Sequence, residues 1–209
     1  MPYKNRIKIH KPDILYHIYG RGINHCELFS DHEDYIFFIY LLKKYLTKDF
    51  KESRIIAKKE VEIPANSVYG QMELYAYCLM PNHFHFLCKN LVDYGITEFS
   101  KRILSVYSGY FNEKIGREGS LIQGSFRAVP IISESQLIHV GRYIHLNPYK
   151  SEIVKESSEY KYSSLQNYIN NRELPWLNLH PTLVQSTDWK HIDSYAKEIE
   201  DNPKQGIFI

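Results

Sequence analysis

The sequence is short of cysteine and of long apolar runs, and each shortage excludes a class of protein. Its 209 residues include three cysteines, Cys26, Cys78 and Cys88, with no CxxC spacing. A count this sparse and odd argues against both a disulfide framework and a structural zinc site, and makes a reducing cytoplasm the simplest expectation. No apolar run reaches the roughly 18 residues that a membrane-spanning helix needs.

An excess of positive charge is also missing. The chain has 26 basic and 24 acidic residues, for a net charge of +2. A protein that mainly binds duplex DNA usually shows a larger basic excess, so composition alone gives little support to that class. Tyrosine occurs 18 times. Aromatic rings can stack on unpaired bases, although most tyrosines in any fold simply pack.

The length fits one domain with a tail better than two full domains. We expect a domain over residues 1–150 and an extension over residues 151–209 that packs on it, with its last twenty or so residues mobile. The basic N-terminus, MPYKNRIKIHKPD, lacks a following apolar stretch. It is therefore expected to be a short disordered arm and not a secretory signal.

Hydrophobic periodicity and turn residues predict an alternating series of strands and helices. Strands are expected at 14–19, 72–80, 83–89 and 125–132, with Pro81-Asn82 as a turn. Helices are expected at 31–47, behind a capping box at Ser30 and Glu33, and at 96–115, with Thr97 as its cap. A third helix, behind a box at Ser133 and Gln136, should stop at Asn147-Pro148. Residues 48–70 are predicted to be a connection or an excursion from the domain.

The resulting order is strand, helix, strand, strand, helix, strand, helix. This order matches the split βαβ plan of a ferredoxin-like domain. The fold class is therefore predicted to be α+β, with a mostly antiparallel central sheet flanked by helices and a C-terminal extension of loops and short helices.

Two histidines on the predicted strand at 83–89 are the first candidate site residues. Residues two apart on a strand point to the same face, so His83 and His85 project together while Phe84 points to the core. Such a pair can hold one metal ion. His-x-His is a weak motif by itself, and two partly exposed histidines on a strand are the simpler interpretation.

Tyr143 and Asn147 are the second pair. They lie four apart on a predicted helix, so they share one face. Asn147 offers a neutral oxygen that suits a hard cation such as Mg²⁺ or Mn²⁺. Tyr143 offers a nucleophile that needs a nearby positive charge to ionise, because a phenol has a pKa of about 10. Spacing alone equally allows a packed Tyr143 and an Asn147 that merely ends the helix.

The strings YCLMPNHFHFL and GRYIHLNPYK, with HIYGRG before them and YSSLQNYI after them, resemble the single-tyrosine HUH transposases. Within that superfamily they are most similar to the REP-associated tyrosine transposases. The resemblance spans residues 12 to 170 and implies an HUH endonuclease domain. It also implies that His83, His85 and Asn147 are ligands of a divalent metal, Mg²⁺ or Mn²⁺, and that Tyr143 is the nucleophile. His145, two residues from Tyr143 on the helix, is left outside the site.

The resemblance further implies a reaction and a ligand. Tyr143 would attack a phosphate polarised by the metal, form a 5′-phosphotyrosine and release a 3′-OH, with no nucleotide cofactor. The DNA partner would be single-stranded and folded as a hairpin. Basic residues near the predicted site elements are candidates for phosphate contacts, although each is equally read as a solvated charge; they are Arg21, Lys101, Arg102, Arg117, Arg127, Arg142 and Lys150.

Two other functions remain open from the sequence. The chain can be a catalytically idle, domesticated hairpin-DNA-binding protein of the same fold, or an unrelated metal-dependent phosphodiesterase that uses water as its nucleophile. The choice between a monomer and a homodimer, the target DNA and the identity of the metal also remain open.

Overall fold

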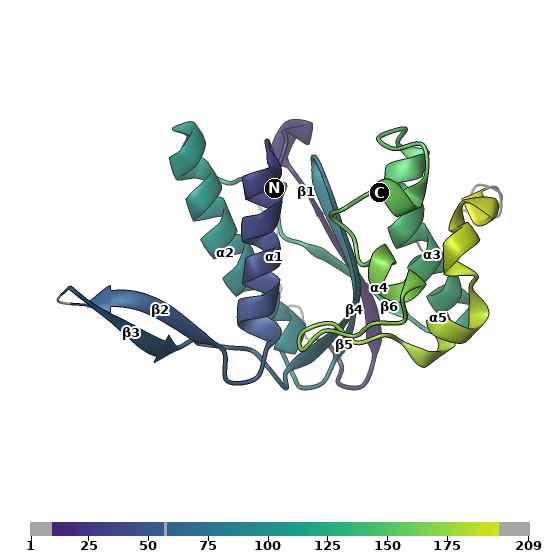
Figure 1. Ribbon diagram of the computed structural model, residues 1–209, viewed down its shortest axis with the longest axis horizontal. Coiled ribbons are helices and arrows are strands. Elements are labelled where there is room, and N and C mark those ends of the chain that lie inside the picture. The colour runs from purple at the N-terminus through teal and green to yellow at the C-terminus, as the bar shows by residue number, and fades with distance from the viewer. Residues whose placement is uncertain (1–9, 57, 197–209) are drawn as a thin grey trace, which may run out of the picture.

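An antiparallel sheet forms the centre of the computed structural model, which describes residues 10–56 and 58–196 (Figure 1). Its strand order is β4-β5-β1-β6, so the first strand lies inside the sheet between two later ones. The strands are β1 (Leu15–Arg21), β4 (Met72–Met80), β5 (His83–Asn90) and β6 (Arg127–Ile131). This order and the antiparallel pairing confirm the predicted α+β, ferredoxin-like class.

Helices cover both faces of this sheet, as Figure 1 shows. Helices α1 (His32–Leu46) and α2 (Gly95–Ile115) pack on one face, where they meet Phe84 and Phe86 of β5. Helix α3 (Glu134–Lys150) packs on the other face, over residues such as Cys78 and Leu87. The strands separate the two cores because successive side chains point to opposite faces.

Helix α1 begins one residue later than the sequence predicts. Its N-cap is Asp31, whose carboxylate accepts a hydrogen bond from the Asp34 backbone N–H at 3.2 Å. The Asp34 carboxylate in turn accepts from the backbone N–H groups of Ser30 and Asp31. The predicted pair of Ser30 and Glu33 is therefore wrong, because a second acidic pair one residue on can form the same box.

Helix α2 takes its N-terminal cap from a strand and not from Thr97. Tyr94 precedes the helix in a left-handed conformation with φ of 66° and provides no side-chain cap. The Asn90 side-chain oxygen at the end of β5 accepts from the Ile96 N–H at 3.0 Å. At the other end Gly116 supplies the left-handed C-cap with φ of 66°. Thr97 lies inside the first turn, so the predicted cap is wrong.

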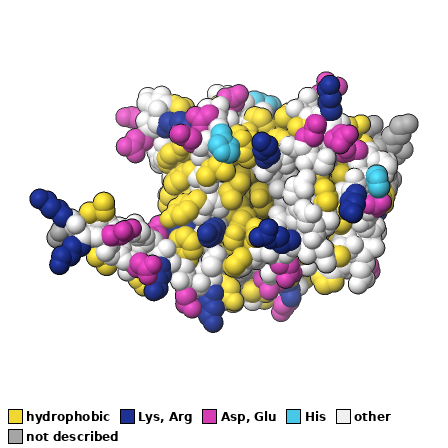
Figure 2. All heavy atoms as spheres, viewed as in Figure 1, with side chains coloured by type: hydrophobic (Ala, Val, Ile, Leu, Met, Phe, Trp, Pro, Cys, Tyr) yellow, Lys and Arg dark blue, Asp and Glu magenta, His cyan; other side chains and the backbone are white. Residues whose placement is uncertain are grey.

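The segment predicted as a connection or an excursion forms a hairpin of its own. Strands β2 (Lys51–Ile56) and β3 (Lys59–Pro64) pair with each other in a separate sheet. The hairpin projects from the end of α1 (Figure 1), and Figure 2 shows lysine and arginine side chains at its tip. A strand is usually recognised by alternating apolar and polar residues, which reflect one buried face. β3 is exposed along nearly its whole length, so burial imposes no such alternation on it.

Helix α3 continues through the proline that was expected to stop it. Ser133 caps it as predicted, by accepting from the Gln136 N–H at 3.2 Å. The Gln136 side chain bonds to the N–H of Ile132, one residue before the expected partner. Pro148 lies inside the last turn, and the helix ends at Lys150. The bias against helix before proline is a preference, and here packing of the surrounding turn overrides it.

The chain after α3 passes along the edge strand β4, where the Leu79 N–H donates to the Tyr162 carbonyl at 2.9 Å, and its last helices pack back against α3. This C-terminal segment contains η2 (Ser157–Glu159), α4 (Leu165–Ile169), α5 (Pro181–Ser186) and η3 (Trp189–Tyr195). One further short helix, η1 (Ile23–His25), follows β1. In the described part of the protein, no helix has the length and apolarity to span a bilayer. Residues 1–9 of the expected N-terminal arm and residues 197–209 of the expected mobile tail lie outside the described residues. Residues 10–13 of that arm pack on the domain, where Asn90 donates to the His10 carbonyl at 2.8 Å, so the expectation of a disordered arm is wrong for them.

Candidate active site

Two neighbouring strands align polar side chains on the sheet face that α3 covers. His83 and His85 alternate with Phe84, which points into the opposite core. In the register of β1 and β5, Tyr19 lies opposite His85 and Arg21 lies opposite His83. Directly opposed residues in an antiparallel pair share a face, so all four polar residues face α3.

Helix α3 brings Tyr143 and Asn147 over this face. The Tyr143 ring lies 5.4 Å from the His85 ring, centroid to centroid, at an interplanar angle of 87°. Asn147 is 8% exposed, and its side-chain nitrogen donates to the Tyr143 carbonyl at 2.8 Å. A strand and a helix far apart in sequence thus bring these residues together over the inner strand β5.

His83 is a neutral imidazole that interacts with two asparagines, Asn82 and Asn147. Burial, followed by the charge of Arg21, lowers its pKa to about 4, while a hydrogen bond with Asn147 acts in the opposite direction. Its Nδ1 lies 2.7 Å from the Asn82 side-chain oxygen, which can only accept. Nδ1 therefore carries the proton, and Nε2 keeps its lone pair.

His85 is fully buried, and burial, followed by the neighbouring His17 and His83, holds its pKa well below the usual value. Its Nδ1 lies 2.9 Å from Nε2 of His17. Its own Nε2 is buried and has no hydrogen-bond partner among the described residues. Buried polar atoms are nearly always paired, so an orphaned nitrogen at this position suits an added ligand.

The donor set fits a divalent cation. Across residues 10–56 and 58–196 no three His, Cys, Asp or Glu side chains cluster as a metal site. The candidate set here consists of two imidazoles, His83 and His85, with the amide of Asn147 as the third member. Imidazole suits transition metals and amide oxygen suits harder ions, so Mn²⁺ or Mg²⁺ with the remaining positions filled by water or phosphate is chemically reasonable.

Tyr143 is half-buried, and its phenol is protonated in the protein alone. Burial raises its pKa well above the ordinary value, while a hydrogen bond from Asn147 and the charge of Arg21 act to lower it. A phenol in this state is a weak nucleophile. Any attack by Tyr143 therefore needs additional positive charge beside its oxygen.

Arg21 is the predicted basic residue that lies at the site. Its charge acts on both His83 and Tyr143. Its Nε is buried and makes no hydrogen bond within the described part of the chain. Arg127 is exposed and lies on the edge strand β6, directly opposite Tyr19 of β1. Because opposed residues share a face, Arg127 lies on the same sheet face as the histidines.

Arg142 does not face the site. It is 8% exposed, donates to the Thr187 hydroxyl at 3.1 Å and to the Ser186 carbonyl at 3.0 Å, and lies 3.8 Å from the centre of the Tyr195 ring. These contacts attach α3 to the C-terminal segment. They commit the guanidinium to the protein interior, so Arg142 is a poor candidate for a phosphate contact.

The other predicted basic residues are spread over the surface. Lys101 and Arg102 belong to α2, on the opposite face of the sheet, and Arg102 bonds to the Asn66 carbonyl at 3.1 Å. Arg117 follows α2 and donates to the Ser120 carbonyl at 2.8 Å. Lys150 ends α3, the helix that carries Tyr143.

His17 is a site neighbour that the sequence reasoning did not single out. It is fully buried on β1, on the face that points toward α3. The signal was present in the string HIYGRG, because residues 17, 19 and 21 of a strand share one face. Its meaning depends on the pairing of β1 with β5, which the local sequence does not reveal.

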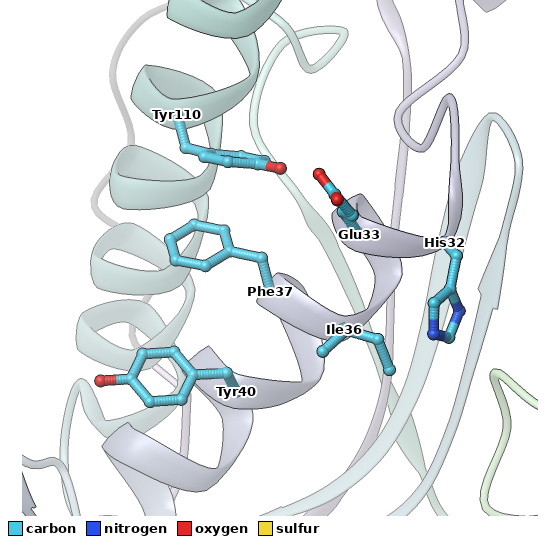
Figure 3. Close-up of a pocket in the computed structure, with 6 residues that line it drawn as sticks. All are labelled: His32, Glu33, Ile36, Phe37, Tyr40 and Tyr110. Carbon is cyan, nitrogen blue, oxygen red and sulfur yellow. The ribbon is translucent and has the colours of Figure 1, made fainter.

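A hollow on the opposite side of the molecule is mostly apolar and separate from this site. Figure 3 shows its residues on α1 and α2, and Figure 2 shows the hydrophobic surface around it. Its lining consists of His32, Glu33, Ile36, Phe37, Tyr40 and Tyr110. It contains none of the residues that the sequence analysis selected for chemistry.

Comparisons with known proteins indicate the family and the fold of the chain. The family model described as "Transposase IS200 like" matches residues 39–147, from within α1 to Asn147. No curated protein matches the chain. One similar solved structure is that of a REP-associated tyrosine transposase bound to a REP hairpin; it covers 90% of this chain and 96% of its own, with a TM-score of 0.53 and 16% identity. At 16% identity, this similarity shows that the two proteins share a fold and does not by itself show a shared activity.

Proposed function

The chain belongs to the IS200-like transposase family, and from that premise we propose that it cuts and rejoins single-stranded DNA with Tyr143 as the nucleophile. The observation that carries the proposal is the approach of the Tyr143 ring to His85, at 5.4 Å between centroids, with Asn147 beside it. A nucleophile, candidate metal ligands and a cationic side chain then act on one phosphate.

His83, His85 and Asn147 would hold a divalent metal, Mg²⁺ or Mn²⁺. When bound, such an ion supplies Lewis-acid polarisation of the scissile phosphate and positive charge near the phenol. The neutral state of both imidazoles supports this assignment, since a metal ligand must be unprotonated.

The chemical step follows from the position of Tyr143. Its oxygen loses the phenolic proton to solvent and attacks phosphorus, forming the Tyr–O–P bond as the P–O3′ bond breaks. The 3′ oxygen takes up a proton and leaves as a hydroxyl, and the 5′ phosphate stays on the enzyme. Attack by another 3′-OH reverses these changes and rejoins the strand, so no nucleotide cofactor is required.

Arg21 and Arg127 would contact the DNA backbone beside the scissile phosphate. Both lie on the face that holds the histidines, and the buried Nε of Arg21 has no partner elsewhere in the described structure. The DNA itself is proposed to be a single strand folded as a hairpin, in keeping with the REP hairpin bound by the similar solved transposase. All the residues of this proposed site belong to one chain, so the proposal does not require a second subunit.

The proposal is tested with Tyr143→Phe and a matched control, Tyr149→Phe, on the same helix. The substrate is a single-stranded hairpin oligonucleotide from the DNA that flanks the gene, with Mg²⁺. We expect Tyr143→Phe to lose cleavage by at least about 10³-fold, because the nucleophile is absent, while hairpin binding stays within about threefold. Tyr149→Phe should cut as the unaltered protein does.

Other outcomes identify the competing functions. Binding without cleavage by the unaltered protein would indicate a hairpin-binding protein without catalysis. Cleavage by Tyr143→Phe at an unchanged rate, with no covalent adduct, would indicate hydrolysis by water. Either result would overturn the proposed function.

A further inference from the structure

His17 and His85 form a buried pair beside the proposed metal ligands. Nε2 of His17 lies 2.9 Å from Nδ1 of His85, and both side chains are fully buried. The rings are stacked at 5.1 Å and 19°. Tyr19 at 5.1 Å and Tyr143 at 6.1 Å from the His17 ring complete its aromatic surroundings. The His17 ring is therefore fixed in place by packing.

Two imidazole nitrogens at this distance share one proton. Rings this deeply buried are neutral, so each carries a single N–H. If the shared proton belongs to His17, then His85 carries its own proton on Nε2 and cannot ligate a metal through that atom. If the shared proton belongs to Nδ1 of His85, then Nε2 has a free lone pair.

The second arrangement agrees with the orphaned atom. Nε2 of His85 is buried without a hydrogen-bond partner in the described residues, and a bound cation would satisfy it. His17 would then accept through Nε2 and carry its proton on Nδ1, which is also buried without a partner among the described residues. The choice between the two arrangements therefore depends on the cation, which satisfies Nε2 of His85 only in the second one. Metal-bound histidines generally donate their second N–H to a nearby acceptor, which fixes both the tautomer and the direction of the ring.

We propose that His17 is a positioning residue that accepts the Nδ1–H of His85 and so holds the His85 Nε2 lone pair toward the metal. The inference rests on the proposed function and extends it to a residue outside the ligand set. In this arrangement Nε2 of His17 accepts from His85 and Nδ1 of His17 carries a proton, so neither nitrogen can ligate the metal and His17 acts through His85.

The tautomer of His85 is the direct test. In protein labelled with ¹⁵N at histidine, long-range ¹H–¹⁵N spectra distinguish an imidazole protonated on Nδ1 from one protonated on Nε2. We expect His85 to carry its proton on Nδ1 both without metal and with saturating Mg²⁺. A proton on Nε2 in the metal-free protein, bonded to no acceptor while His17 donates, would overturn the proposal.

Two substitutions test the consequence for metal affinity. His17→Gln keeps an acceptor near the position of Nε2, and His17→Phe keeps a flat ring without one. Measured by calorimetry with Mn²⁺, we expect His17→Phe to lose about 10- to 100-fold in affinity and His17→Gln to recover most of it. A role limited to packing would favour Phe over Gln, the reverse order.

Failure of the inference and failure of the proposed function give different results. If the unaltered protein binds no Mn²⁺, the metal-dependent function fails. If it binds Mn²⁺ and folded His17→Phe binds equally well, His17 has no positioning role. Should His17→Phe not fold, the tautomer of His85 in the unaltered protein still decides the question.

Discussion

Tyr143 combines two properties that conflict unless a cation is close. Burial beside His85 fixes the ring where it can attack, yet the same burial raises the pKa of the phenol. Asn147 and Arg21 act to lower that pKa but do not offset burial. The Tyr143 phenol therefore stays protonated in the free protein. Its ionisation depends on the positive charge of a bound metal ion.

Arg21 should matter for cleavage far more than for hairpin binding. Arg21→Gln removes the charge beside Tyr143 and His83, and we expect the single-turnover cleavage rate to fall about 10²-fold, a typical loss for one donor to a reacting phosphate. Arg172→Gln, which changes an exposed arginine on the C-terminal segment, is the control. Equal effects of the two substitutions would exclude a local role for Arg21.

For single residues, the sequence predicts which side chains share a face when both lie on the same strand or helix. The common face of His83 and His85 follows from strand periodicity, and that of Tyr143 and Asn147 from helical spacing. His17 and Arg142 could not be assigned in this way. The first depends on which strand lies beside β5, and the second on where the C-terminal segment packs.

Among the elements, α3 is held in place by the chain that follows it. His145 is hydrogen-bonded to the Ser164 hydroxyl at 2.8 Å and to the Gly141 carbonyl at 2.9 Å. Gly141 lies directly against Leu183, because a Cβ atom at position 141 would lie only 2.8 Å from a Leu183 methyl carbon. The C-terminal segment thus sets the position of the helix that carries Tyr143.

Gly141→Ala tests this contact, with Gly109→Ala in α2 as its matched control. Alanine at 109 meets nothing within 4 Å, so it should stabilise the protein by about 0.5–1 kcal/mol through helix propensity. Alanine at 141 must displace Leu183, and we expect a net loss of about 1–3 kcal/mol. Urea unfolding measures both; a stabilised Gly141→Ala protein would show that the segment is loosely packed.

The β2–β3 hairpin should be dispensable for stability. The Ala65 N–H donates to the Phe50 carbonyl at 2.8 Å, so the two ends of the hairpin lie close enough for Asn-Gly to replace residues 51–64. The side chains removed are mainly exposed, apart from Glu52, which pairs with Lys44. We expect the free energy of unfolding in urea to change by less than about 1 kcal/mol. A decrease above about 3 kcal/mol would place the hairpin in the folded core.

The elements that sequence reasoning missed or misplaced have specific physical causes. Helix α1 is capped by Asp31 and not by Ser30, because Asp31 and Asp34 form the capping box. Helix α2 is capped by Asn90, from the end of β5, and not by Thr97. The buried strands β4 and β5, in contrast, were predicted within a residue. Their apolar alternation is strong and a proline turn separates them, so little depends on distant contacts.

For the whole molecule, buried neutral histidines predict sensitivity to acid. Burial lowers the pKa of His17 to about 3, and those of His83 and His145 to about 4, from an ordinary value of 6.5. Below pH 6.5 the unfolded chain binds protons that the folded protein does not. The stability present above this pH is therefore lost as the pH falls toward 4.

These three histidines should accordingly remove about 4 kcal/mol of unfolding free energy from the metal-free protein between pH 7.5 and 5.5, about 1.4 kcal/mol each. His85, whose pKa burial also lowers, adds to that loss. Urea titration in EDTA measures the change. His145→Gln should reduce the difference by about 1.4 kcal/mol, while His191→Gln, at an exposed position, should leave it unaltered. Equal stability at the two pH values would mean that the histidines are accessible to protons.

Mapping of the covalent adduct tests the central claim most directly. The protein is incubated with hairpin single-stranded DNA and Mg²⁺, the DNA is digested, and tryptic peptides are sequenced by mass spectrometry. Cleavage after Arg142 and Lys150 releases a peptide that contains both Tyr143 and Tyr149. We predict a nucleotide linked through its 5′ phosphate to the Tyr143 oxygen. An adduct on Tyr149 or any other residue, or DNA cleavage without an adduct, would contradict the proposed mechanism.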